Sequence, residues 1–111
     1  MQITETEAGA VTVLVPQGPL CGADAKAFRD AAVDAMQRHR GRFVIDASGV
    51  PFADSEGLEA LLDLTETLGA GGRSLKLCQL GDTLREALEI VGIEGLFELY
   101  PDVNAAVRSF L

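Results

Sequence analysis

The chain has 111 residues, of which 48% are hydrophobic and 23% are charged, and its formal net charge at pH 7 is −8. This length fits one domain over residues 1–111, with one hydrophobic core and no room for a second. The charged fraction and the short apolar runs exclude both a disordered chain and a membrane-spanning helix.

The bulk properties also limit the partners and the compartment. The excess of acidic residues repels phosphate backbones and anionic membrane surfaces, so we expect neither direct nucleic-acid binding nor membrane insertion. The first residues lack the basic and apolar regions of a signal peptide, which predicts a cytoplasmic protein. Cys21 and Cys78 lie far apart and outside any metal-ligand spacing, so we expect two reduced thiols, no metal site and no cofactor.

The first part of the chain predicts two strands and a helix. Residues 11–15 are mostly β-branched and are bounded by turn residues, and residues 3–7 are placed to pair with them as an edge strand. From Asp24 up to Gly41, apolar residues recur at helical spacing and predict an amphipathic helix of about four turns. His39, the only histidine, lies in its last turn, where it suits the helix dipole. The helix is expected to bury Ala25, Phe28, Ala32, Ala35 and Met36.

A buried strand and a helix start frame the stretch around which the chain is organised. Residues 43–45 form an unbroken apolar run, which predicts a strand covered on both faces. After Asp46, a loop with a glycine and a proline leads to a helix that starts at Asp54 and Ser55 and ends at Gly69. Because α/β proteins present their sites at the carboxyl edge of the sheet, this loop and first helical turn form the candidate site. One stripe of the helix is expected to face the core: Leu58, Leu61, Leu62 and Leu68.

The remaining elements complete the predicted fold. Residues 74–78 predict a strand, and a helix follows that begins with a capping box of Thr83 and Glu86 and is closed by Gly92. Residues 96–100 predict a last short strand, and a terminal helix follows it. The alternation predicts an α/β fold in which helices pack against a small mixed β-sheet.

Asp54 and Ser55 have two compatible interpretations. Both residue types are preferred helix N-caps, and Glu56 in the first turn suits the helix dipole. A phosphate on Ser55 would lie at free backbone N–H groups, so the folded chain could accommodate it. It would add a charge of about −1.5 to −2 beside Asp54, Glu56 and Glu59, and a partner that closes over the unmodified hydroxyl would lose binding. The pattern therefore fits a switch that acts by occlusion.

At these residues the sequence resembles the STAS family, the sulfate-transporter and anti-sigma-factor-antagonist domains, particularly the free-standing bacterial antagonists. The family pattern is an apolar strand with Asp, a loop with an apolar residue and Phe, and then Asp-Ser-small-Gly-Leu, which residues 43–46, 50–52 and 54–58 match. The resemblance covers nearly the whole chain in length and element order. It implies an anti-sigma-factor antagonist that binds an anti-sigma-factor serine kinase, is switched off by phosphorylation of Ser55, and is reset by a PP2C-type phosphatase.

The resemblance also places the expected partner-binding surface. Two residues in it depart from the family pattern: Glu56 stands where a small residue is usual and adds a permanent negative charge, and Cys21 stands where an acid is common. Leu20, Phe52 and Leu58 are its apolar candidates, with burial in the core as the open alternative for Phe52 and Leu58. Formation of a homodimer is left open. The expected partner-binding residues are Asp54, Ser55, Glu56, Gly57, Leu58, Leu20, Cys21 and Asp24.

Three other functions compete with this one. The same fold could serve as an accessory STAS subunit of an ABC-type lipid transporter, in which Ser55 and Leu58 contact the ATPase without being modified. A response-regulator receiver would use Asp46 as phosphoacceptor, but residues 15–18 supply no acidic pair to hold magnesium. An enzyme is disfavoured, because no nucleophile elbow, metal cluster or nucleophile–histidine pairing is evident.

Overall fold

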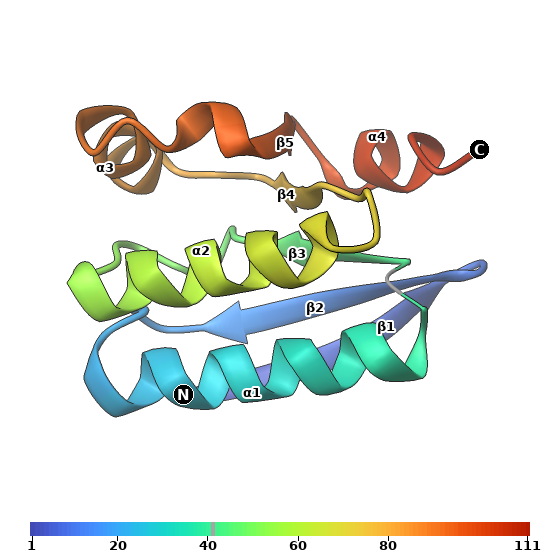
Figure 1. The fold of residues 1–111 in the computed structure, drawn as a ribbon, viewed down its shortest axis with the longest axis horizontal. Coiled ribbons are helices and arrows are strands. Elements are labelled where there is room, and N and C mark those ends of the chain that lie inside the picture. Colours follow the sequence, from blue (N-terminus) through green and yellow to red (C-terminus); the bar gives the residue numbers. More distant parts are fainter. Residues whose placement is uncertain (41) are drawn as a thin grey trace.

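The computed structural model describes residues 1–40 and 42–111, so Gly41, the predicted end of the first helix, lies outside the described residues. None of the described helices combines the length and the apolar composition needed to cross a membrane. Figure 1 shows the elements, which in chain order are β1 (Gln2–Ala8), β2 (Val11–Gln17), α1 (Gly22–Arg38), β3 (Phe43–Asp46), α2 (Ser55–Gly69), β4 (Leu75–Cys78), α3 (Asp82–Ile90), the 3-10 helix η1 (Glu94–Leu96), β5 (Phe97–Tyr100) and α4 (Val103–Arg108).

The strands form one five-stranded sheet in the order β1-β2-β3-β4-β5. β1 runs antiparallel to β2, whereas β2, β3, β4 and β5 are all parallel to their neighbours. The opening hairpin predicted for residues 3–7 and 11–15 is therefore confirmed. So is the fold class, a small mixed sheet with helices packed against it (Figure 1).

β3 lies in the middle of the sheet and is covered on both faces. Phe43 and Ile45 belong to the larger core cluster, together with side chains of α1, α2 and α3. Val44 points to the opposite face, as alternation along a strand requires, and packs in a second cluster with Cys78 and with Ala106 of α4. The prediction of a strand buried on both faces is confirmed, and its carboxyl end is thereby held rigidly.

The two helices that flank the candidate site bury the expected faces with one difference. In α1, the five residues predicted to be buried are all buried, and the helix begins at Gly22, two residues before the predicted start at Asp24. In α2, Leu61 and Leu68 are buried, but Leu58 and Leu62 are only half-buried. The centre of that face is occupied instead by Ala60 and Leu64.

The second half of the fold corrects two local predictions. α3 begins at Asp82 with Gly81 at its N-cap, and no side chain caps it. The predicted capping box of Thr83 and Glu86 is therefore wrong, because the helix has already begun when it reaches Thr83. The last strand begins at Phe97 rather than one residue earlier, since η1 takes up Leu96.

Candidate functional site around Ser55

The loops that leave β2 and β3 run side by side at the carboxyl edge of the sheet. The amide of Leu20 donates to the carbonyl oxygen of Phe52 at 3.0 Å, and the amide of Asp54 donates to the carbonyl oxygen of Leu20 at 3.1 Å. Leu20 and Ala53 thereby form a parallel bridge beyond the ends of the strands. This extension of the β2–β3 pairing fixes the point at which α2 begins.

Asp54 is the N-cap of α2, and its carboxylate serves two helices. Oδ1 accepts a hydrogen bond from the amide of Gly57 at 2.9 Å, which is the capping bond of α2 itself. Oδ2 accepts another from the amide of Gly22, the first residue of α1, at 3.2 Å. The predicted helix start at Asp54 and Ser55 is confirmed, and the same carboxylate also ties the start of α1 to the start of α2.

Ser55 is the first residue of α2 and is exposed to solvent. Its hydroxyl makes no hydrogen bond to another described residue. The backbone amides of Ser55 and Glu56 likewise find no acceptor among the described residues, as is usual for the first turn of a helix. A polar group on the Ser55 oxygen would therefore meet free donors and the positive end of the helix dipole.

Gly57 lets the first turn of α2 lie directly on the loop that leaves β2. A methyl group at this position would lie 2.1 Å from the carbonyl oxygen of Leu20, and 2.8 and 2.9 Å from the Cβ atoms of Leu20 and Ala53. No larger side chain fits without moving the backbone. The glycine of the motif at 54–58 is thus a packing requirement that holds Ser55 at the surface.

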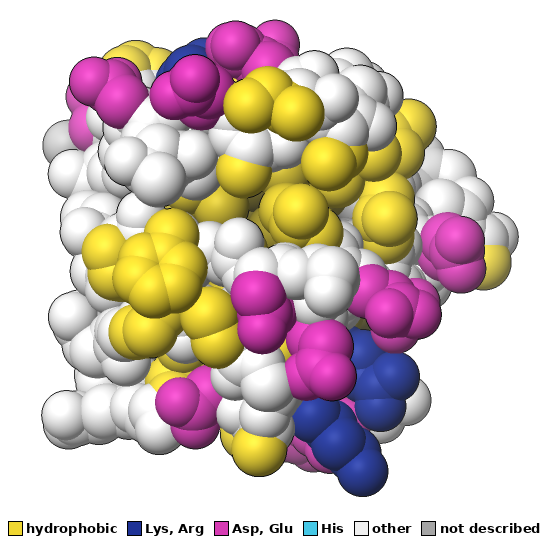
Figure 2. Space-filling model, turned by 90° about the vertical axis from the view of Figure 1, so that its left-hand side faces the viewer, with side chains coloured by type: hydrophobic (Ala, Val, Ile, Leu, Met, Phe, Trp, Pro, Cys, Tyr) yellow, Lys and Arg dark blue, Asp and Glu magenta, His cyan; other side chains and the backbone are white. Residues whose placement is uncertain are grey.

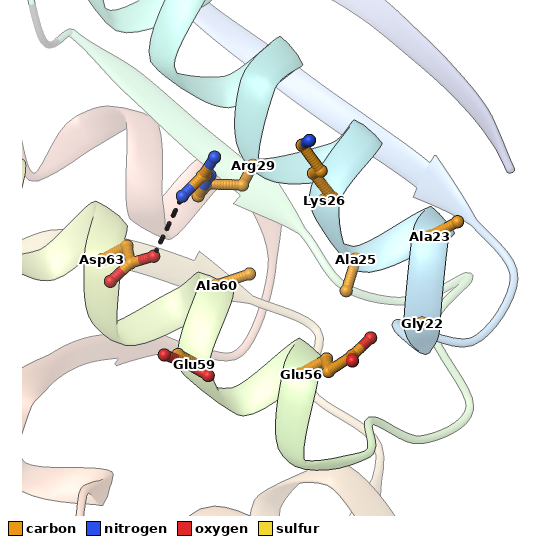
Figure 3. Close-up of a pocket in the computed structure, with 9 residues that line it drawn as sticks. All are labelled: Gly22, Ala23, Ala25, Lys26, Arg29, Glu56, Glu59, Ala60 and Asp63. Carbon is orange, nitrogen blue, oxygen red and sulfur yellow. Dashed lines mark hydrogen bonds and ion pairs between the residues drawn. The ribbon is translucent and has the colours of Figure 1, made fainter.

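A charged groove of about 350 Å³ opens next to the Ser55 turn, between the first halves of α1 and α2 (Figure 3). Glu56 and Glu59 line it from α2, and Lys26 lines it from α1. At its far end Arg29 donates to the carboxylate of Asp63 at 3.3 Å. That hydrogen bond raises the pKa of Arg29, with a smaller contribution from Asp30, so this side chain is a cation at neutral pH.

The end of the molecule that carries Ser55 combines acidic and apolar side chains. Figure 2 looks onto this end and shows acidic groups beside yellow apolar patches. Phe52, two residues before the N-cap of α2, is 47% exposed. An exposed aromatic ring close to an acidic helix start is typical of a protein-binding surface rather than of a closed small-molecule pocket.

The remaining predicted partner-binding residues lie in different environments. Leu20 is 2% exposed and belongs to the core, so its side chain is not available to a partner and the prediction fails for it. Cys21 is half-buried at the N-cap of α1, where its side chain caps nothing. Asp24 lies on the first turn of α1, and the amino group of Met1 lies 2.9 Å from its Oδ1. Leu58 is half-buried and packs against the core.

Asp24 was the one residue of α1 predicted for this site, and the sequence patterns missed the basic face of the same helix. The pair Lys26 and Arg29 has the spacing of one helix face, but no local signal shows that this face lies opposite Glu56. The amide of Gly22 was missed for the same reason, since its partner Asp54 is far away along the chain.

Two other residues with potential chemistry have structural roles. Oδ1 of Asp46 accepts hydrogen bonds from the amide of Ser48 at 3.0 Å and from Nε2 of Gln79 at 2.9 Å, so it joins two loops instead of standing free as a phosphoacceptor. Burial, and after it the negative charge of Asp46, raises the pKa of Cys78 to about 12. That thiol therefore stays protonated and unreactive at neutral pH.

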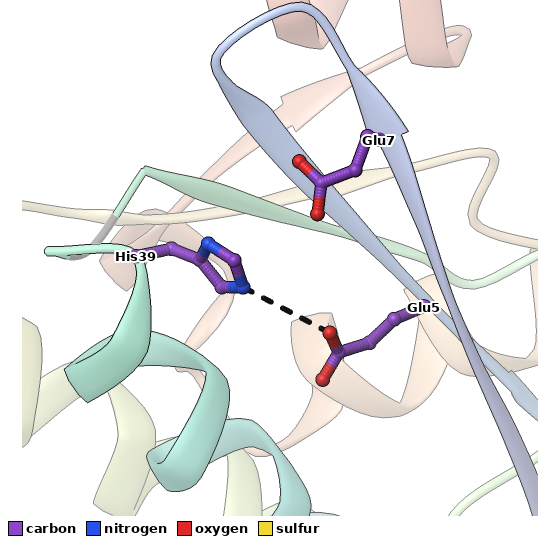
Figure 4. Close-up of side chains that lie close together, drawn as sticks. All are labelled: Glu5, Glu7 and His39. Atoms are coloured by element: carbon purple, nitrogen blue, oxygen red, sulfur yellow. Dashed lines mark ion pairs between the residues drawn. The ribbon is translucent and has the colours of Figure 1, made fainter.

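His39 lies in a carboxylate cluster far from Ser55. Figure 4 shows it at the end of α1, with its ring facing Glu5 and Glu7 of β1, and its Nε2 lies 3.8 Å from Oε2 of Glu5. Ligand atoms of all three side chains lie within 4.8 Å of one another. Arg38, however, donates to both oxygens of Glu5, so that carboxylate is already engaged by a cation.

Comparisons with known proteins show to which family the chain belongs. The profile of the STAS domain matches residues 2–106. The chain belongs to the STAS domain family. Among curated proteins, the chain is 24% identical over 110 residues to BtrV of Bordetella bronchiseptica, which is named as an anti-sigma factor antagonist, and the match covers 99% of this chain and 95% of BtrV.

Solved STAS structures share the fold at low identity. A crystal structure named as an anti-sigma factor antagonist from Thermotoga maritima superposes with a TM-score of 0.87 at 16% identity, covering 96% of this chain and 92% of the other. The anti-sigma factor antagonist SpoIIAA in its unphosphorylated form superposes with a TM-score of 0.76 at 17% identity, covering 98% and 96%. SpoIIAA of Bacillus in its phosphorylated form gives 0.69 at 17% identity, covering 97% and 99%.

Proposed function

We propose that this STAS domain is an anti-sigma-factor antagonist that binds an anti-sigma-factor serine kinase and is released when the kinase phosphorylates Ser55. The observation that carries the proposal is the exposed Ser55 hydroxyl, which lies at the start of α2 beside two backbone amides that have no acceptor among the described residues. The likeness to SpoIIAA, which has been solved in both phosphorylated and unphosphorylated forms, supports the same assignment.

The local geometry supports modification without loss of the fold. A phosphate on Ser55 would accept hydrogen bonds from the amides at the helix start, where the dipole favours negative charge. The structural bonds of Asp54 to Gly57 and Gly22 use the carboxylate and not the serine hydroxyl, so phosphorylation removes neither.

The charge around Ser55 makes the modification decisive for a partner. A phosphate adds about −1.5 to −2 between the carboxylates of Asp54 and Glu56. A kinase surface that packs on Phe52 and closes over the hydroxyl would have to desolvate the phosphate. The free energy of this desolvation exceeds what a charge contact at the edge of an interface contributes to binding. Resetting the switch then requires hydrolysis of the phosphoserine, the reaction of a PP2C-type phosphatase.

We place the chain among binding modules and not among enzymes. Ser55 is at the start of α2, beside the first residue of α1, whereas His39 follows the last residue of that helix. A helix of 17 residues is roughly 25 Å long, so the single histidine cannot serve Ser55 as a general base.

The proposal is tested by phosphorylation in an extract of the native host. The wild-type protein and the variants Ser55→Ala and Ser48→Ala are incubated with ATP and magnesium, and intact mass and peptide mapping then locate any phosphate. We expect phosphate on the wild type and on Ser48→Ala, but none on Ser55→Ala. Ser48 is an exposed serine of the loop that leaves β3, so it controls for nonspecific modification.

Absence of phosphate on the wild type, in an extract that phosphorylates a control substrate, contradicts the proposal. That result favours the alternative, an unmodified accessory STAS subunit of an ABC-type transporter. The alternative is then tested by isolating the ATPase that copurifies with the wild type and is lost from Phe52→Ala, whose aromatic ring is part of the exposed surface.

A further inference from the structure

A basic groove lies at the amino edge of the parallel strands, the edge opposite to the one that leads into Ser55. It has a volume of about 400 Å³ and is bordered by the end of α1, the residue that precedes β3 and the turn before β4. Four of the nine basic residues of the chain converge on it, although the chain has seventeen acidic residues. The charged and ionisable residues that line it are Arg38, His39, Arg40, Arg42 and Arg73.

Most of these cations are not neutralised from within the chain. Arg38 forms ion pairs with Glu5 and Asp34. Within residues 1–40 and 42–111, the side chains of Arg40, Arg42 and Arg73 form no ion pair, and all three are exposed. Guanidinium groups that converge in this way repel one another, so an acidic group placed among them gains attraction from several at once.

The groove continues along the same edge into a second hollow. This one has a volume of about 300 Å³ and shares Arg42 and Arg73 with the first. Its other lining residues include Lys76, whose ammonium group already binds Glu98 at 3.0 Å and lies 4.7 Å from the ring centroid of Phe110. The joined groove is thus elongated, with Arg42 and Arg73 at its centre. Because Glu98 also lines the second hollow and neutralises Lys76, the uncompensated positive charge comes from Arg40, Arg42 and Arg73.

We propose that this arginine groove is a second interaction surface of the chain and binds an acidic segment of a protein partner. Planar guanidinium groups bind carboxylates in a bidentate manner, and an elongated groove offers them to successive carboxylates of an extended peptide. A nucleic-acid strand fits less well, because its phosphates would continue past the groove over a chain with a net charge of −8. The surface works independently of Ser55, since it lies at the opposite edge of the sheet.

The experiment uses a fluorescein-labelled octaglutamate peptide as probe and measures its anisotropy with the full chain at low salt. We expect Arg42→Gln and Arg73→Gln each to raise the Kd of the peptide by about fivefold or more. Arg85→Gln removes the same charge from an exposed position on α3 and should leave the Kd within about twofold, since a distant rim charge contributes little. Neither groove variant should lower the melting temperature, because both side chains are exposed and pair with no acidic side chain in the described part of the chain.

Each alternative outcome overturns the proposal in a recognisable way. Equal weakening by all three variants would mean that only the net charge matters. No binding of the peptide to the wild type at low salt would reject an acidic partner outright. Tighter binding of a single-stranded oligonucleotide of equal charge, lost in Arg42→Gln and Arg73→Gln, would assign the groove to nucleic acid instead. Ser55→Asp should bind the peptide as tightly as the wild type does. A failure of this proposal can therefore be distinguished from a failure of the proposed phosphorylation of Ser55.

Discussion

At Gly57, a single methyl group is enough to disturb the first turn of α2, since it would lie 2.1 Å from the carbonyl oxygen of Leu20. We expect Gly57→Ala to lower the free energy of unfolding by about 2 kcal/mol or more, the usual cost of overpacking against backbone. Denaturant unfolding measures this loss. Gly69→Ala, at the last residue of the same helix, is the matched control, because a methyl group there has nothing within 4 Å. Equal stabilities of the two variants would contradict the packing role.

Asp54 and Asp102 are both helix N-caps, and the difference between them isolates one hydrogen bond. Among the described residues, the carboxylate of Asp102 accepts from the amide of Ala105 in α4 alone, whereas that of Asp54 accepts from the amides of Gly57 and Gly22. Loss of a cap costs about 1 kcal/mol, and we expect Asp54→Ala to cost about 1 kcal/mol more than Asp102→Ala because it also releases the start of α1. Thermal or denaturant unfolding of both variants gives the difference. A smaller loss for Asp54→Ala would mean that the second bond contributes nothing.

At the scale of elements, β4 and β5 are joined by a small polar cluster. The hydroxyl of Tyr100, and next Lys76, hydrogen-bond the carboxylate of Glu98 and lower its pKa. A carboxyl group whose pKa is lower in the folded state stabilises the fold above its unfolded pKa of about 4.3 and loses this contribution as the pH falls through the folded value. We therefore expect Glu98→Gln to lower the melting temperature at pH 7 but to have little effect in strong acid.

The control for this pH dependence is Glu86→Gln, which removes an exposed carboxyl group from α3. A loss that is the same for Glu98→Gln at both pH values would show that packing, and not the charge of Glu98, stabilises the contact between β4 and β5.

Helix and strand interiors were predictable because the pattern of apolar residues is local. The buried face of α1 and the doubly covered strand β3 follow from spacing and from an unbroken apolar run. Element starts were less predictable where distant residues decide them. α1 begins at Gly22, whose amide donates a hydrogen bond to the carboxylate of Asp54. α3 begins at Asp82 without the predicted capping box.

The candidate site was predictable as a motif but not as a surface. Residues 54–58 lie next to one another in the sequence, and the placement of Ser55 on the first turn of α2 followed from them. Burial of Leu20, exposure of Phe52 and the position of Lys26 opposite Glu56 depend on how two loops and two helices meet. No pattern within a few residues contains that information.

For the whole molecule, the exposed position of Ser55 outside the core means that the proposed switch and the stability of the fold can be tested separately. Ser55→Asp adds a charge of about −1 at an exposed helix start, where the dipole favours it. We expect the melting temperature to stay within about 2 °C of the wild type, while binding to the cognate kinase weakens at least about tenfold. Calorimetry tests the expected melting temperature, and a binding titration on the same preparation tests the expected loss of affinity. Unaltered affinity would remove the basis of the switch.

The shared carboxylate of Asp54 also has a consequence for the motions of the chain. Because the amides of Gly22 and Gly57 both donate to it, the starts of α1 and α2 cannot fray separately without breaking a bond of the other. In hydrogen exchange, these two amides should open together, with similar protection, as one cooperative unit. Any enzyme that must loosen the turn to reach Ser55 would then work against two helices at once, which would limit the rate at which the switch can be set and reset.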